Sequence, residues 1–401
     1  MKGKYTATGN PLVEAKVEEI LERIKDEVVR RFKPESIILH GSFGRGEGSV
    51  IVDNCNLIFL SDFEISIVTP KRIGGDLKKL ASEVGKEIGA EIGLWRNKPG
   101  KYSSYRVRKP TIENYELKYG SKILYGENYL EKIPDFKPED IPLWEGIRLM
   151  FNRMAESLKY FSINYKHSEP SGDEKQKLVY SIYKIVLGCQ DALLLSIKKF
   201  HYSYKIRNEM FQELFPNYFD NLNMEIPNFL PLTIKATNYK LRPEKNYSEN
   251  AIELWFDTME VCDKVFRYVI EKDMGFTFST YLEFQENYLS HPNIIKKYYQ
   301  RLSGSPIYQN LVSFAIMWIS SRKCPSLKML ANIKIPWIHL AYSAIPLVYF
   351  SISREWKINK PQLRQAGNTL KLFTDFHTYQ YNLSAWDHLK DITYQTWNAI
   401  K

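Results

Sequence analysis

The sequence predicts an α+β protein in which a short mixed sheet with flanking helices comes first and a mainly α-helical region follows. Within the first 135 residues, short apolar runs typical of strands alternate with amphipathic helical segments. Beyond residue 143, long segments with apolar residues at three- and four-residue spacing dominate. A chain of 401 residues is also too long for one core. We therefore expect several domains.

The N-terminal part has a clear order of elements. Val13, Val17, Ile20 and Ile24 recur at helical spacing, and Pro34 ends that helix. The expected elements in chain order are a helix over 12–32, a strand over 36–40, a hairpin within 50–59, a strand over 60–68, a helix over 75–89 and a strand over 90–95.

The later part reads as helical. A segment over 110–126 closes the first module, and Pro134, Pro138 and Pro142 mark a linker. Helices are expected over 144–163, 176–200 and 251–271. The predicted domains are residues 1–135, 136–275 and a basic, aromatic-rich helical domain over 276–401.

Two carboxylates, Asp62 and Glu64, stand one residue apart in the apolar run over 60–68. Residues i and i+2 of a strand point to the same face, so the two acids project together while Phe63 faces the core. Two carboxylates on one face can hold Mg²⁺ together with substrate phosphates. An Asp-x-Glu pair is also common on the solvated face of a strand, so the pair needs support from its surroundings.

That support comes from a glycine-rich segment after the strand over 36–40. Its residues are His40-Gly41-Ser42-Phe43-Gly44-Arg45-Gly46-Glu47-Gly48. Backbone N–H groups in such a turn can hold phosphate. An apolar strand, Gly-Ser and then Asp-apolar-Glu on the next strand resemble the nucleotidyltransferase superfamily typified by polymerase beta and the aminoglycoside nucleotidyltransferases. The resemblance covers about residues 12–130, and the inserted hairpin makes the Gly-Ser to Asp spacing longer than is usual there.

The resemblance implies transfer of a nucleoside monophosphate from a nucleoside triphosphate to a hydroxyl-bearing small molecule or RNA, with release of pyrophosphate. Asp62 and Glu64 would ligate Mg²⁺, with Mn²⁺ as a possible substitute. Gly41, Ser42 and Arg45 would bind the nucleotide. Arg45 could equally be an exposed loop arginine.

A third carboxylate usually follows on a later strand in this superfamily. Glu91 begins the strand after the second helix and is the first choice for that catalytic role. Glu113 and Glu116 are the rivals, and a site without a third acid is the remaining alternative.

Composition limits the setting. Four widely spaced cysteines indicate neither a zinc site nor a disulfide framework. No signal peptide is recognisable, and two prolines in the apolar segment 335–352 favour a buried helical region over a membrane span. We expect a cytoplasmic protein without a membrane partner; no oligomeric state follows from the sequence.

The net charge is +10, and residues 276–401 carry 14 Lys and Arg against 6 Asp and Glu, which leaves +8 there. A basic region suits an acidic partner such as RNA, although a solvated lysine-rich surface would look the same. Two alternative functions therefore stay open: a synthase of nucleotide second messengers, and a catalytically degenerate protein that binds nucleotide or RNA.

Overall fold

A computed structural model describes residues 3–53, 56–99, 105–106, 108–245, 247–293, 337–374 and 380–400. The protein is a mixed α+β structure, 62% helical, with a small mixed sheet of four strands. It divides into two compact units. Unit 1 comprises Met1–Pro142, Ile197–Asp220 and Leu230–Tyr247; unit 2 comprises Leu143–Ser196, Asn221–Phe229 and Ser248–Lys401. The expected coarse fold class is confirmed.

The sheet of unit 1 has the strand order β5-β4-β1-β6. Strand β1 (Ser36–His40) is antiparallel to both β4 (Phe63–Val68) and β6 (Lys122–Gly126), whereas β4 is parallel to β5 (Ile92–Asn97). Three of these strands match the expected segments. The sequence had marked the fourth, β6, only as part of a closing segment, and it pairs with β1 to complete the sheet.

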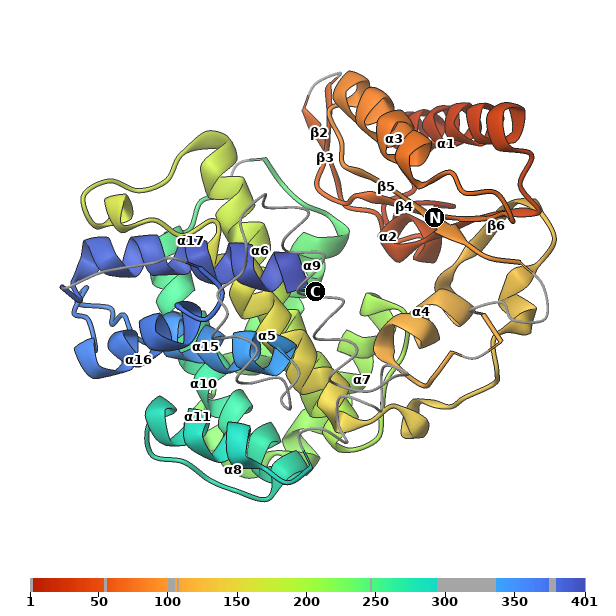
Figure 1. The fold of residues 1–401 in the computed structure, drawn as a ribbon. Helices are drawn as coiled ribbons and strands as arrows, with labels where there is room; N and C mark the ends of the chain where they lie inside the picture. The colour runs from red at the N-terminus through yellow and green to blue at the C-terminus, as the bar shows by residue number, and fades with distance from the viewer. Residues whose placement is uncertain are drawn as a thin grey trace. The chain divides into compact units, whose positions relative to one another are not determined.

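Helices α1 (Pro11–Phe32) and α3 (Gly74–Ile88) cover one face of this sheet (Figure 1). Their apolar stripes pack against the strand residues that alternate toward that face. The shared core includes Val17, Ile20, Ile37, Leu39, Phe63, Ile65, Ile67, Leu77 and Leu80. The asparagine before α1, Asn10, accepts hydrogen bonds from the backbone N–H groups of Leu12 and Val13, which fixes where the helix begins.

Four shorter elements complete the N-terminal segment. The one-turn helix α2 (Gly41–Arg45) follows β1 directly, and α4 (Ile112–Gly120) precedes β6. The expected hairpin is present as β2 (Val50–Asp53) paired with β3 (Asn56–Phe59). The glycine-rich segment is thus a tight helical turn rather than an open loop.

Unit 1 also includes two helices from much later in the sequence, α7 (Tyr204–Tyr218) and most of α9 (Phe229–Leu241). Polar contacts join these two helices to the N-terminal segment. Glu47 accepts hydrogen bonds at the start of α7, and the Ser49 hydroxyl donates to the Lys240 carbonyl at the end of α9. The predicted segment 136–275 therefore contributes to both units, a long-range arrangement that local sequence patterns do not encode.

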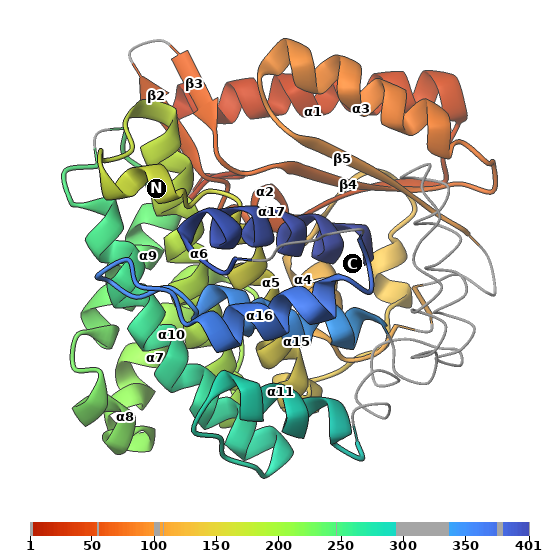
Figure 2. The same cartoon turned by 60° about the vertical axis from the view of Figure 1, so that its left-hand side comes forward.

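Unit 2 is helical, and the predicted segment 276–401 falls within it. Figure 2 shows two of its helices, α15 and α16, side by side. The main helices of the unit are α5 (Leu143–Leu158), α6 (Gly172–Ser196), α10 (Ala251–Met274), α11 (Tyr281–Ser290), α15 (Trp337–Tyr349), α16 (Lys360–Leu370) and α17 (Leu383–Ile400). The short helix α8 (Asp220–Glu225) lies between α7 and α9 in the chain. Part of the predicted basic domain, residues 294–336, lies outside the described residues.

Two apolar helices of unit 2 bear on the membrane question. The apolar segment expected to be a buried helix forms α15, and its side chains are almost all buried. Among the described residues, α6 alone is long and apolar enough to cross a membrane, yet 89% of its most apolar window is buried inside the protein. Such burial is what the core helix of a soluble protein shows.

Candidate functional site

The two predicted acids lie on the sheet face opposite α1 and α3. Phe63 and Ile65 of β4 are fully buried in the core, so by strand alternation Asp62 and Glu64 project from the other face. Asp62 is exposed and immediately precedes β4, whereas Glu64 is partly buried within it. In the antiparallel register Glu64 lies opposite His40, the last residue of β1. Glu64 therefore lies beside the start of the glycine-rich turn.

The first glycine of that turn is in close contact with Glu64. Gly41 has a φ of 65°, in the left-handed region that favours glycine. A Cβ atom at this position would overlap a carboxylate oxygen of Glu64. Any other residue would be strained and would push the carboxylate away. The Gly-Ser turn and the acid pair, which are separated in sequence by the hairpin, thus meet at one point.

Glu64 has an unusual acidity. Burial raises its pKa from 4.5 to about 7, and the neighbouring Asp62 charge acts in the same direction. Arg45 opposes this shift without cancelling it. Among the described residues, no Lys or Arg lies within ion-pair distance of Glu64. A divalent cation would relieve this electrostatic cost.

The histidine beside the acids does not supply the missing positive charge. The Nε2 atom of His40 lies 3.2 Å from the hydroxyl oxygen of Ser66. Burial lowers the pKa of His40 to about 4, so its imidazole is neutral at neutral pH. His40 therefore adds no positive charge beside the acids.

Arg45 is buried rather than exposed, so the loop-arginine alternative is wrong. Its NH1 lies 2.8 Å from Glu116, and its Nε lies 3.7 Å from Glu47. A second buried arginine, Arg207, contacts the other oxygen of Glu116 at 3.2 Å. Burial alone would lower the pKa of Arg45, but the charges of Glu116 and Glu47 more than offset it. The guanidinium is therefore held inside unit 1 by carboxylates.

Glu47, near the end of the glycine-rich segment, anchors the turn to α7. Its carboxylate accepts hydrogen bonds from the Ser203 hydroxyl at 2.6 Å, from the Tyr204 N–H at 3.0 Å and from the Lys205 N–H at 3.3 Å. An acid at a helix N-terminus satisfies free N–H groups and favours the helix dipole. Glu47 thus joins the end of the glycine-rich segment to a helix more than 150 residues later.

A buried lysine lies next to the residue that precedes the first acid. Lys240 Nζ is 3.2 Å from the Ser61 hydroxyl, and that hydroxyl oxygen also accepts the N–H of Ser49 at 2.9 Å. Lys240 is 5% exposed, so its charge is well shielded from water. These contacts fix the backbone that leads into Asp62.

The three candidates for a third acid differ in position. Glu91 is exposed and precedes β5, where its carbonyl accepts the N–H of Phe63 at 2.9 Å. By alternation from the core residues of β5, its side chain is on the same face as Asp62. Glu116 is paired with two arginines, and Glu113 is exposed on α4. Glu91 is therefore next to Asp62 on the adjacent strand, whereas the charges of Glu116 and Glu113 act on Glu64 and help to raise its pKa.

Part of this arrangement has no local sequence signal. Glu47, Ser203, Arg207 and Lys240 come from segments that no motif connects, and only the folded chain brings them together. One available hint was the glutamate placed inside a glycine-rich segment, where an acid would oppose phosphate binding unless it had another partner.

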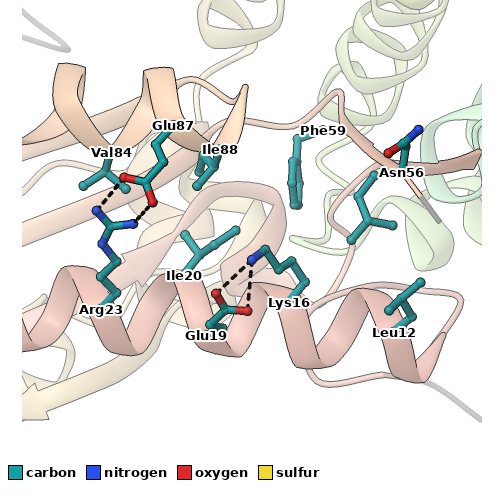
Figure 3. Close-up of a pocket in the computed structure, with 11 residues that line it drawn as sticks. Leu12, Lys16, Glu19, Ile20, Arg23, Asn56, Phe59, Val84, Glu87 and Ile88 are labelled. Atoms are coloured by element: carbon teal, nitrogen blue, oxygen red, sulfur yellow. Dashed lines mark hydrogen bonds and ion pairs between the residues drawn. The ribbon is translucent and has the colours of Figure 1, made fainter.

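A cavity of unit 1 is lined by apolar and charged side chains that do not include the acids (Figure 3). It has a volume of about 310 Å³ and lies between α1, α3 and the β2–β3 hairpin. Ion pairs between Arg23 and Glu87 and between Lys16 and Glu19 lie at its edge, as the dashed lines in Figure 3 show. It contains none of the predicted site residues.

Comparison with known proteins gives no assignment: no family model matches the chain, and no curated protein or solved structure matches it either. Within the described residues, no group of three or more His, Cys, Asp or Glu side chains is arranged to hold a metal ion. Two carboxylates are nevertheless the usual protein share of a Mg²⁺ site that is completed by phosphates and water. The donor set of Asp62 and Glu64 fits that role.

Proposed function

We propose that this chain is a Mg²⁺-dependent nucleotidyltransferase that moves a nucleoside monophosphate from a nucleoside triphosphate to a hydroxyl group of a small molecule or RNA. The observation that carries the proposal is the contact between Gly41 and the Glu64 carboxylate, beside Asp62. A glycine turn and a pair of hard oxygen ligands lie together, and the raised pKa of Glu64 shows that its negative charge is costly where it lies.

The proposed roles follow from these positions. Backbone N–H groups at Gly41 and Ser42 hold the outer phosphates, and the Ser42 hydroxyl adds a donor. Asp62 and Glu64 hold Mg²⁺, which supplies charge neutralisation and orientation at the transferred phosphoryl group. The charge of Arg45 is already balanced by Glu116 and Glu47, so its proposed role is to hold the turn in place and not to bind phosphate itself.

The reaction balances as follows. The acceptor oxygen forms a bond to the α-phosphorus, and the bond between that phosphorus and the bridging oxygen to the β-phosphate breaks. Pyrophosphate leaves with that oxygen. In this scheme Glu91, on the same sheet face as Asp62, takes the acceptor proton. The nucleoside monophosphate is then joined to the acceptor as a phosphodiester.

The test uses the full chain with Mg²⁺ and each α-labelled nucleoside triphosphate in turn, alone, with an RNA pool and with a small-molecule extract. Labelled adduct and released pyrophosphate are both measured. The Asp62→Asn/Glu64→Gln variant should lose at least about 100-fold in turnover, because phosphoryl transfer depends on metal-mediated charge stabilisation.

The matched control is Asp76→Asn/Glu83→Gln on α3, which removes two acids of exposed positions from the same unit. It should leave turnover unchanged. Product in the arm without acceptor would instead identify a synthase of nucleotide second messengers. Absence of turnover, together with salt-sensitive RNA binding that the double variant does not alter, would contradict the proposal and favour a degenerate binding protein.

A further inference from the structure

Strand β5 carries an unusual pair of residues beside Glu64. In the parallel register Gly93 lies next to Glu64, and Trp95 lies next to Ser66. The residue between them, Leu94, belongs to the core on the α1/α3 side. Gly93 and Trp95 are therefore on the same sheet face as the acids.

The indole of Trp95 leans back along its strand toward Glu64. A Cβ atom at Gly93 would overlap the benzenoid part of the ring, so the indole lies directly over the glycine. Its ring centroid is also 5.4 Å from that of His40, the residue opposite Glu64. The glycine thus lets the aromatic ring reach the end of the sheet where the acids lie.

Trp95 nevertheless remains 45% exposed, which leaves much of a large aromatic surface in contact with water. An isolated exposed aromatic residue needs no special explanation. This one is held by Gly93 and His40, and it lies one strand beyond the acids on the side away from β1. An accessible ring at such a point can stack on a planar ligand.

We propose that Trp95 is the stacking platform for the base of the nucleoside triphosphate. This rests on the proposed function, because it uses the direction in which the triphosphate would lie. The outer phosphates lie at Gly41 and Ser42 after β1, and the α-phosphate lies at the acids on β4. The nucleoside, attached to the far side of the α-phosphate, then extends over β5. An indole face accepts any base, so Trp95 contributes affinity with little discrimination among bases.

The test compares two probes by calorimetry in the presence of Mg²⁺: ATP, which has a base, and inorganic tripolyphosphate, which has none. Trp95→Ala should weaken ATP binding by about 5-fold to about 100-fold, as expected for the loss of one base–aromatic stack. It should leave tripolyphosphate binding unchanged. Trp95→Phe, which keeps a ring, should retain most of the ATP affinity.

The matched control is Tyr125→Ala, which removes another exposed aromatic residue, 40% exposed, from the strand at the other edge of the sheet. It should change neither affinity. If Trp95→Ala weakened the binding of ATP and of tripolyphosphate equally, or weakened neither, the stacking inference would be overturned while the phosphate site stands. A wild-type chain that binds neither probe would refute the proposed function itself, and the stacking role with it.

Discussion

Two carboxylates, Glu64 in unit 1 and Glu156 in unit 2, have pKa shifts of opposite sign. Burial and the Asp62 charge raise the pKa of Glu64 to about 7. Burial alone would also raise the pKa of Glu156, but the charges of Lys184 and Arg153 more than offset it and hold the pKa well below 4.5. The two residues differ in their neighbours rather than in their chemistry.

The neighbours explain what each carboxylate does for the protein. Glu156 lies 2.8 Å from Lys184 and 2.7 Å from Arg153, so α5 and α6 are joined by a balanced group of charges. Glu64 has an acid beside it and a glycine against it. A charge arrangement that costs stability in the folded state is typical of functional sites, and for this reason we propose the function for unit 1.

The largest expected effect on stability comes from Glu116, because its carboxylate balances two buried arginines. Glu116→Gln would leave Arg45 and Arg207 without their shared negative partner. Breaking a buried ion pair in this way typically costs about 3–5 kcal/mol. We expect a loss of that size in the free energy of unfolding, measured by urea denaturation.

The control for this variant is Glu113→Gln, which changes an exposed acid of the same helix. It should change the unfolding free energy by less than about 0.5 kcal/mol. Equal stability of the two variants would show that the Arg45–Glu116–Arg207 cluster does not hold the turn, and would return Arg45 to the phosphate role predicted from the sequence.

Glu64→Gln should change the free energy of unfolding in the opposite direction and stabilise the protein. The folded state binds a proton at Glu64 more tightly than the unfolded state, so its favourable contribution is present below pH 4.5 and is lost as the pH rises through about 7. Removing the charge should therefore stabilise the protein by about 1–3 kcal/mol at pH 8. Urea denaturation without metal measures this, and a destabilised variant would show that the Glu64 charge does not cost stability.

The local structure around Glu64 could be predicted from the sequence, because local patterns specify local structure. The alternation in 60–68 predicts that Asp62 and Glu64 share a sheet face, and the helical spacing in 12–32 predicts α1. The partners of Arg45 could not be predicted. Glu116 and Arg207 come from distant segments, and nothing in their own surroundings in sequence indicates that they meet.

The burial of Arg45 shows the same limit of sequence patterns. Sequence reasoning treated Arg45 as either exposed or bound to phosphate, because a glycine-rich segment usually lies at the surface. The described structure buries it, since Glu47 in the same segment pairs with the start of α7 and draws the turn inward. Burial of a charged residue depends on long-range partners, which composition and periodicity do not report.

Glu156→Gln should destabilise the protein more modestly, by about 1–2 kcal/mol at pH 7, because its two cations are partly accessible to water. Its pKa is lowered on folding, so its contribution is present above 4.5 and is lost as the pH falls below that value. The difference between the variant and the wild type in urea denaturation should therefore shrink progressively as the pH falls from 4.5 toward the lowered pKa of the folded state. A difference that does not shrink over that range would mean that the side chain stabilises by packing and not by its charge.

The smallest expected effect is the release of a proton from Glu64 when a metal ion binds. If Mg²⁺ binds at Asp62 and Glu64, it must displace the proton that Glu64 carries below pH 7. Mg²⁺ affinity should then rise up to about tenfold per pH unit between pH 5.5 and 7, and level off above that range. Calorimetry in two buffers of different ionisation enthalpy measures the released proton directly. Glu64→Gln should abolish the release, whereas Glu156→Gln should preserve it. Release that survives Glu64→Gln would place the metal elsewhere.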